Sequence, residues 1–414
     1  MILRLAAALL ACAGPACAAP AWQGVYEGVV GASRIIVSLA PEGARYVYVT
    51  RPDDLGLIVE ESGGGLKITE TLAPGISAAD VKDNPKLVTG QWTLAQQGEK
   101  LTGRWSDAKG QRGRAISLTR VAKQAENIDD PRIPGQLGAY SARWLASAPA
   151  FVPQGGEASL GPLSYTMMRD DLYGNAVPRL TRAPKGVRIG AANAALEQLH
   201  LALVLLDRDC AQNLRSSAAL TDPARLAEID RPAKKGGRDP NASITPVFAS
   251  ASLLTLYESR SRFCGGAHPT NSVAAYVFDL ATPRQLTGLR EGGDDLGPSG
   301  LGGALDFSDG VKRTRFDAMW VARFRAAIAE DRKAHAGDET SEACGSDIDS
   351  QLEQSGAGIG KLVYPVKDGL AIRASNFGQA AAVCASDYAA NPLVIPWRDL
   401  RPFLNPGQTL LPEG

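Results

Sequence analysis

Short strand-like runs separated by turn residues fill the chain from Trp22 to Val121, and this pattern limits what the region can fold into. The runs are Val25–Val30, Arg34–Leu39, Arg45–Thr50, Leu57–Glu61, Leu66–Thr71, Gly90–Leu94, Leu101–Ser106 and Ala115–Arg120. They start about every ten residues, apart from a longer insertion near Ala73–Pro85, as short strands do when each pairs with the next. We therefore expect a small all-β domain over 19–122, an antiparallel meander that forms a barrel or a sandwich.

A local repeat supports the pairing of two of these strands. The sequence TGQW, which ends at Trp92, recurs as TGRW, which ends at Trp105, and Gly98 lies in the turn between them. Two strands joined in this way can place both indoles on one face of a hairpin. Such a pair can line a ligand cup, but Trp is usually buried whatever the function, so we interpret Trp92 and Trp105 as core residues.

The N-terminal segment 1–18 has the pattern of a secretory signal peptide. Arg4 supplies a positive charge, Leu5–Ala13 is an apolar run, and Ala16–Ala18 has the small-x-small pattern that signal peptidase requires. We expect cleavage after Ala18 and a mature protein that is periplasmic or secreted. A lipoprotein attached at Cys12 is the lesser alternative, because its signal would be very short.

The rest of the sequence predicts neither a transmembrane segment nor a nucleic-acid partner. The longest apolar run, Leu199–Leu206, ends at Asp207 and falls well short of the roughly 18 residues that span a membrane. The 44 Lys and Arg residues are balanced by 44 Asp and Glu residues. Without a basic surplus, there is no electrostatic drive toward non-specific binding of nucleic acid.

A polar stretch over 123–136 is expected to link the β-domain to a second, α+β domain over 137–405, with an antiparallel sheet and packed helices. Expected helices are Gly190–Leu214 and Phe316–Ala336, and expected strands are Val247–Cys264, Val273–Leu280, Leu362–Val366 and Leu370–Ala374. In the first helix, four leucines and Cys210 recur every three or four residues, so Cys210 lies on the face that packs against the core.

The cysteines that remain after the predicted cleavage are Cys210, Cys264, Cys344 and Cys384. An even number in an oxidising compartment favours disulfides, and three pairings are possible. We favour Cys210–Cys264 together with Cys344–Cys384, because Cys264 ends the strand candidate that follows the Cys210 helix. None of the four lies in a Cys-x-x-Cys pair or has a second ligand at zinc spacing, so no metal site is expected.

Part of the second domain resembles a known extracytoplasmic bacterial domain. The segments that carry the resemblance are Val177–Leu180, Phe263–Pro269 (FCGGAHP), Ala275–Leu280, Gln285–Thr287, Lys367–Leu370 and Val394–Leu400. Together they are similar to the domain found in RsiV-like anti-sigma factors and beside the catalytic part of some peptidoglycan deacetylases. The likeness covers about 177–404, is carried mainly by the Gly-Gly-Ala-His block, and does not extend to the β-domain.

The resemblance implies an extracytoplasmic binding module, which in RsiV-like proteins binds lysozyme. The sequence departs from both groups of relatives. It has no counterpart of the transmembrane helix and sigma-binding segment of the anti-sigma factors. It also has no counterpart of the metal-binding catalytic domain of the deacetylases.

A search for chemically reactive groups gives few candidates. Of the three histidines, His200 and His335 lie on predicted helices and are interpreted as structural, whereas His268 lies in a Gly-rich turn. The candidate binding residues are therefore Gly265, Gly266, His268 and Pro269. For His268 itself, hydrogen bonding to turn carbonyls is the favoured role, because no base or metal partner is identified.

Acidic pairs and common catalytic motifs offer no better candidate. The pairs Asp170-Asp171 and Asp294-Asp295 lie in polar stretches and are expected to be solvated. The chain contains neither a Gly-x-Ser-x-Gly motif nor a His-Glu-x-x-His motif. No catalytic residue and no cofactor is predicted.

These observations favour a non-enzymatic binding protein of the bacterial envelope. Its surface would bind an envelope protein, lysozyme included, or a glycan. The alternative is a cell-envelope hydrolase whose carboxylate pair comes together only in the fold. The oligomeric state and the ligand are not predicted.

Overall fold

The computed structural model describes residues 20–51, 53–123, 137–147, 149–222, 225–229, 242–265, 270–288, 305, 310–334, 336, 350, 353, 361–374, 392–408 and 411. The chain forms two compact units. The barrel unit comprises Met1–Asp129, Leu137–Ala148 and Ala211–Arg231, and the sheet unit comprises Asp130–Gln136, Pro149–Cys210 and Pro232–Gly414. Together they make a mixed α+β protein, as the sequence predicted.

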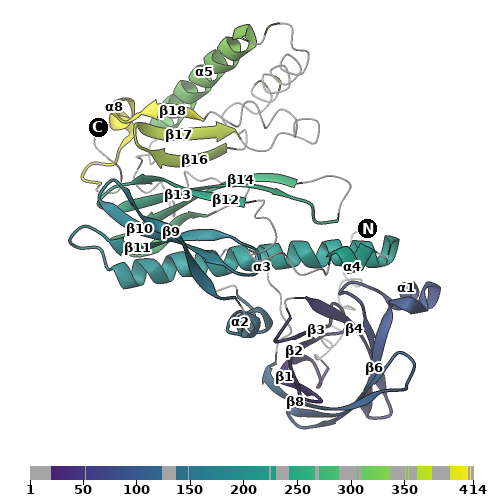
Figure 1. The fold of residues 1–414 in the computed structure, drawn as a ribbon. Helices are drawn as coiled ribbons and strands as arrows, with labels where there is room; N and C mark the ends of the chain where they lie inside the picture. Colours follow the sequence, from purple (N-terminus) through teal and green to yellow (C-terminus); the bar gives the residue numbers. More distant parts are fainter. Residues whose placement is uncertain are drawn as a thin grey trace, which may run out of the picture. The chain divides into compact units, whose positions relative to one another are not determined.

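The barrel unit is built on a closed antiparallel meander of eight strands (Figure 1, purple to blue). The strands are β1 (Gly24–Val30), β2 (Ser33–Leu39), β3 (Arg45–Tyr48), β4 (Asp54–Ser62), β5 (Gly65–Thr71), β6 (Val88–Gln97), β7 (Lys100–Asp107) and β8 (Gly113–Ala122). Each strand pairs with the next, and β1 pairs with β8 to close the ring. This pairing confirms the predicted antiparallel meander and shows that it forms a barrel and not a sandwich. A closed barrel has no free sheet edge.

A buried carboxylate organises part of the barrel interior. Glu70 on β5 is 3% exposed and accepts hydrogen bonds from Tyr46, Thr89 and both tryptophans. The indole nitrogens of Trp92 and Trp105 each lie 2.8 Å from Oε2 of Glu70. Burial and the nearby Glu70 charge raise the pKa of Tyr46 above its usual range, so its hydroxyl remains a donor. The two tryptophans are thus parts of a packed polar cluster.

The repeated Gly-x-Trp sequence has a steric reason in this cluster. Gly90 lies directly opposite Glu70, and Trp92 lies opposite Trp105. A Cβ atom at Gly90 would lie 2.4 Å from the indole nitrogen of Trp105. Glycine at this position therefore leaves the space through which Trp105 reaches Glu70.

The barrel unit also includes segments that the sequence placed in the second domain. The helix α2 (Ala139–Leu145) is tied to the barrel because the Tyr140 hydroxyl donates to Oδ1 of the buried Asp54 at 2.8 Å. Ala218, Ala219 and Leu226 share a small apolar cluster with side chains of the β5–β6 connection. That connection carries the helix α1 (Ala78–Asp83), and the helix α4 (Leu226–Ile229) follows α3. The predicted boundary between the two domains at residue 137 therefore differs from the boundaries of the compact units. Apart from residue 123, the predicted linker over 123–136 lies outside the described residues.

The sheet unit contains three antiparallel sheets (Figure 1). Their strands are β9 (Phe151–Leu160), β10 (Leu163–Asp170) and β11 (Ala176–Arg182); β12 (Ala242–Ala249), β13 (Leu253–Arg262), β14 (Thr270–Asp279) and β15 (Arg284–Gly288); and β16 (Lys361–Val366), β17 (Gly369–Ala374) and β18 (Leu393–Pro396). The described helices of this unit are α3 (Ile189–Thr221) as far as Cys210, α5 (Gly310–Ala334) and the short α8 (Trp397–Leu400). The predicted strand Val247–Cys264 is wrong, because it is the hairpin of β12 and β13.

The four-stranded sheet separates two hydrophobic cores. Along β13 and β14, Leu254 and Tyr276 belong to the core that contains the leucines of α3. The alternate residues Leu253 and Val277 belong to a second core with α5 and the strands β16 to β18. This alternation follows from the two-residue period of a strand, and it buries both faces of the sheet.

Helix α3 is the most apolar helix of the described chain. By length and composition, Ile189–Thr221 is the one described helix that could cross a membrane. In this structure its leucines at 196, 199 and 203 are instead buried against β13 and β14. The same helix carries the buried polar side chains of His200, Arg208, Gln212 and Arg215.

Replacing Gly90 by Ala should destabilise the barrel. The added methyl group displaces the Trp105 indole from Glu70, and overpacking of this kind costs about 1–3 kcal/mol. Urea unfolding followed by tryptophan fluorescence measures the effect. Gly156→Ala is the matched control, because a Cβ atom there meets nothing within 4 Å. Equal unfolding midpoints for the two variants would contradict the steric role of Gly90.

Candidate functional site

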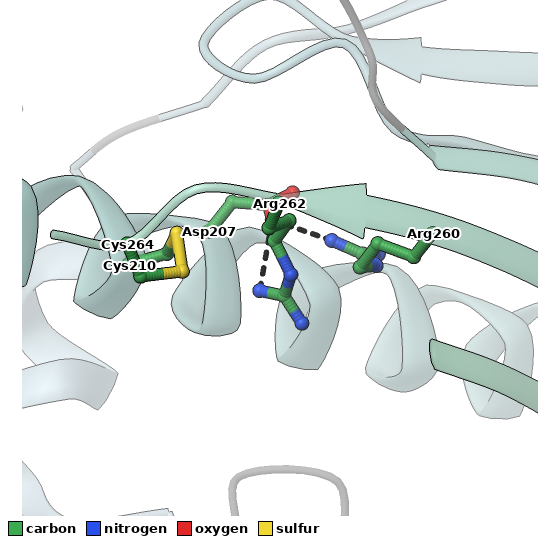
Figure 2. Close-up of a disulfide and its surroundings, with 5 residues drawn as sticks. All are labelled: Asp207, Cys210, Arg260, Arg262 and Cys264. Carbon is green, nitrogen blue, oxygen red and sulfur yellow. Dashed lines mark hydrogen bonds and ion pairs between the residues drawn. A yellow bond between two sulfur atoms is a disulfide. The ribbon is translucent and has the colours of Figure 1, made fainter. Parts of the chain in front are cut away.

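A disulfide joins helix α3 to the end of strand β13 in the sheet unit. Cys210 and Cys264 are bonded, with their Cα atoms 4.6 Å apart and 54 positions apart in the sequence (Figure 2). This is the pair that the apolar spacing of the helix predicted. A cross-link that closes a loop of this length contributes roughly 4 kcal/mol in the chain-entropy account. It fixes the point at which the chain leaves β13 toward the Gly-Gly-Ala-His turn.

Charged side chains beside the disulfide hold the same two elements together. Asp207, one turn before Cys210, accepts hydrogen bonds from the guanidinium groups of Arg260 and Arg262 (Figure 2). Arg260 is 3% exposed and also donates to Glu258. The Tyr276 hydroxyl donates to the other oxygen of Glu258.

Asn175, which directly precedes β11, also belongs to this network. Its Nδ2 atom donates to Asp207 at 2.8 Å, and its Oδ1 atom accepts from Arg260 at 3.1 Å. Two acids and two arginines therefore share a largely buried and mutually compensated cluster. Removing one member of such a set leaves an uncompensated buried charge, which typically costs about 3–5 kcal/mol.

The residues next to the disulfide form the described part of the predicted binding turn. Phe263 is 42% exposed, although it lies next to this largely buried network. Gly265 has a φ angle of 89°, in the left-handed region that favours glycine. Of the predicted binding residues, Gly265 lies here, while Gly266, His268 and Pro269 lie outside the described residues. The same holds for Cys344 and Cys384, for His335, and for Asp294 and Asp295.

His200 lies in a second polar group within the sheet unit. Its side chain is 3% exposed, and Nε2 lies 2.8 Å from the carbonyl oxygen of Asn175 and 3.5 Å from Oδ2 of Asp170. A carbonyl oxygen can only accept, so Nε2 of His200 carries a hydrogen and donates it. The ring also packs on Phe151, with 4.3 Å between the ring centroids.

Asp170 corrects one expectation from the sequence. The pair Asp170-Asp171 was expected to be solvated, but Asp170 is 1% exposed at the end of β10. Its Oδ1 atom accepts hydrogen bonds from the backbone amides of Leu172, Tyr173 and Gly174. Burial opposes the charged form, but the bonds from His200, Tyr173 and Gly174 outweigh it, and together they lower the pKa of Asp170.

A cavity of about 420 Å³ opens beside His200, between the strands β9 to β11 and the first turns of α3. The residues that line it are Phe151, Met168, Val177, Pro178, Arg179, Gly190, Asn193, Ala194, Leu196, Glu197 and His200. This volume is in the range of small-molecule sites. Of these lining residues, none carries a hydroxyl or thiol group that could act as a nucleophile.

Sequence reasoning missed the charged cluster and the cavity for different reasons. Glu258, Arg260 and Arg262 alternate along one strand, and this period-two charge pattern is a signal that could have pointed to a shared partner. The cavity has no such signal, because its walls come from three strands and a helix.

Across the described part of the chain, no group of three or more His, Cys, Asp or Glu side chains could hold a metal ion. Comparison with protein-family models and with curated proteins finds no match for this sequence.

The stabilising effect of Asp170 should depend on pH with a defined sign. Because its pKa is lowered on folding, its contribution is present above the unfolded-state value of about 3.8 and is lost as the pH falls through the folded-state value. We expect Asp170→Asn to reduce the free energy of unfolding by about 2 kcal/mol near neutral pH, with a smaller difference from wild type below pH ~4.

Urea denaturation between acidic and neutral pH measures this difference. Asp171→Asn is the control, since the exposed Asp171 accepts one amide hydrogen bond through Oδ1, which asparagine retains. A difference between Asp170→Asn and wild type that does not change with pH would show that the charge of Asp170 is unimportant.

Proposed function

We propose that this chain is an exported, non-enzymatic binding protein of the bacterial envelope. Its binding surface directly follows β13 and comprises Phe263, Cys264 and Gly265, together with Gly266, His268 and Pro269, which the sequence predicts to lie in a turn. The partner is an envelope protein such as lysozyme, or a glycan. The observation that carries the proposal is the exposed Phe263 beside the disulfide that joins Cys264 to α3.

The anchoring supports a binding role because binding loops work best on a rigid base. Asp207 and the disulfide hold the last residues of β13 against the helix over the span from Arg260 to Cys264. A partner that binds there contacts the Phe263 side chain, whose neighbouring backbone is already held in place before binding. Preorganisation of this kind reduces the conformational entropy that is lost on binding.

The disulfide also supports an extracytoplasmic location. Stable disulfides are typical of oxidising compartments and rare in the cytosol. This agrees with the expectation drawn from residues 1–18 and with the resemblance to an extracytoplasmic domain over about 177–404. The location and the family relationship are both parts of the proposal.

The hydrogen bonds of four buried or partly buried acids favour binding over hydrolysis. Glu70, Asp170, Asp207 and Glu258 each accept hydrogen bonds from the protein's own donors. A glycosidase instead needs two carboxyl groups that face each other across the substrate. These four side chains are committed to holding the fold.

Thiol labelling tests the exported, oxidised state. In the unreduced protein from the envelope fraction, Cys210 and Cys264 should resist alkylation because both sulfur atoms are bonded. Labelling after reduction and unfolding, read by mass spectrometry of the peptides, is the positive control. Full labelling of both cysteines without reductant would contradict the proposal.

Replacing Phe263 by Ser should weaken partner binding by about tenfold, as loss of an aromatic anchor usually does. Purified lysozyme and isolated cell-wall glycan are the probes, and titration calorimetry gives the affinities. Val394→Ser is the control, because Val394 is exposed to a similar extent at 37% but lies on β18. Both variants should keep the wild-type melting temperature.

The same preparations are assayed for release of soluble wall fragments. Turnover of the wall polymer that is lost on substituting one acidic residue would favour the hydrolase alternative. Equal affinities of wild type and Phe263→Ser for the partner would show that the surface at the end of β13 is not the binding surface.

A further inference from the structure

The cavity beside His200 has the chemistry of a small-ligand site, and none of its lining residues belongs to the binding surface proposed above. Its floor is apolar, with Phe151, Met168 and Leu196 among the lining residues. One fully buried polar side chain, His200, reaches it. A largely apolar hollow with a few fixed polar groups is the usual form of a site for a small organic molecule.

Two charged residues of opposite sign also line this cavity. Arg179 comes from β11 and Glu197 from α3, and both are exposed. Within the described residues, neither side chain makes a hydrogen bond or an ion pair, with the other or with a third residue. This differs from the nearby Asp207 cluster, in which acids and arginines compensate one another. The cavity therefore presents one positive and one negative group that remain available to a ligand.

The geometry points to a ligand that carries both charges and an apolar group. We propose that the cavity binds a free amino acid or short peptide with an apolar side chain. The carboxylate of the ligand pairs with Arg179, its ammonium group pairs with Glu197, and its side chain lies on Phe151, Met168 and Leu196. An arginine suits a carboxylate because its planar donors match the two oxygens.

His200 places a polar side chain of fixed orientation in the wall of this cavity. Its Nε2 atom is occupied by the carbonyl of Asn175, and Phe151 packs on the ring, so the imidazole is held in one orientation.

Titration calorimetry with three dipeptides tests the proposal on the whole mature protein. The probes are leucyl-leucine, its C-terminal amide and its N-acetyl derivative. Leucyl-leucine should bind most tightly, and blocking either charged end should weaken binding by about fivefold, the upper range for an exposed ion pair. Failure of leucyl-leucine to bind at millimolar concentration would overturn the proposal.

Variants then assign each charge to its partner. Arg179→Gln should bind leucyl-leucine and its amide equally, while it still discriminates against the acetylated form. Glu197→Gln should show the reverse pattern. Arg182→Gln is the matched control, because Arg182 is exposed on the same strand but does not line the cavity. If both cavity variants retain the wild-type preference, the assignment is wrong.

A variant that fills the cavity tests whether leucyl-leucine binds there. Ala194 is an exposed helix residue that lines the hollow, so Ala194→Trp fills the space without replacing a core side chain. It should abolish leucyl-leucine binding and leave the melting temperature unchanged. Wild-type affinity in Ala194→Trp would overturn the proposal, whatever the outcome with lysozyme or wall glycan.

Discussion

The connection between α3 and β13 is the constraint on which the arrangement of the sheet unit depends. The helix supplies the leucines of one core, and the strand belongs to a sheet that separates this core from a second one. A disulfide and the Asp207–Arg260 pair fix the two elements at the same place. Apolar packing alone fixes how far a helix lies from a sheet, but directional bonds fix its register along the strands.

In the barrel, hydrogen bonds to one buried carboxylate fix the positions of side chains from different strands. Its interior needs a polar group to orient large aromatic side chains, and Glu70 does so with neutral donors only. Tyr46, Trp92 and Trp105 are thereby held in one arrangement, whereas apolar rings packed without such bonds have several similar alternatives.

The periodic parts of both units could be predicted from the sequence, and the contacts between distant segments could not. Regular turn spacing predicted the meander, and the leucine spacing of α3 placed Cys210 on its core face. The β12–β13 turn was missed because it is built from serines: Ser250 caps the amides of Ser252 and Leu253, with no Gly or Pro to mark it. The burial of Asp170 depends on His200, thirty positions away, and no local pattern reports such a partner.

Asn175 belongs to both polar groups of the sheet unit. Its backbone carbonyl accepts from His200 beside the cavity, and its side-chain amide binds Asp207 of α3 and Arg260 of β13, the strand that ends one residue before Phe263. A displacement of this one residue changes the energies of both neighbourhoods together. By thermodynamic reciprocity, a ligand of the proposed cavity site that shifts Asn175 would alter affinity at the proposed surface beside Phe263. A partner bound at that surface would alter affinity at the cavity by the same factor.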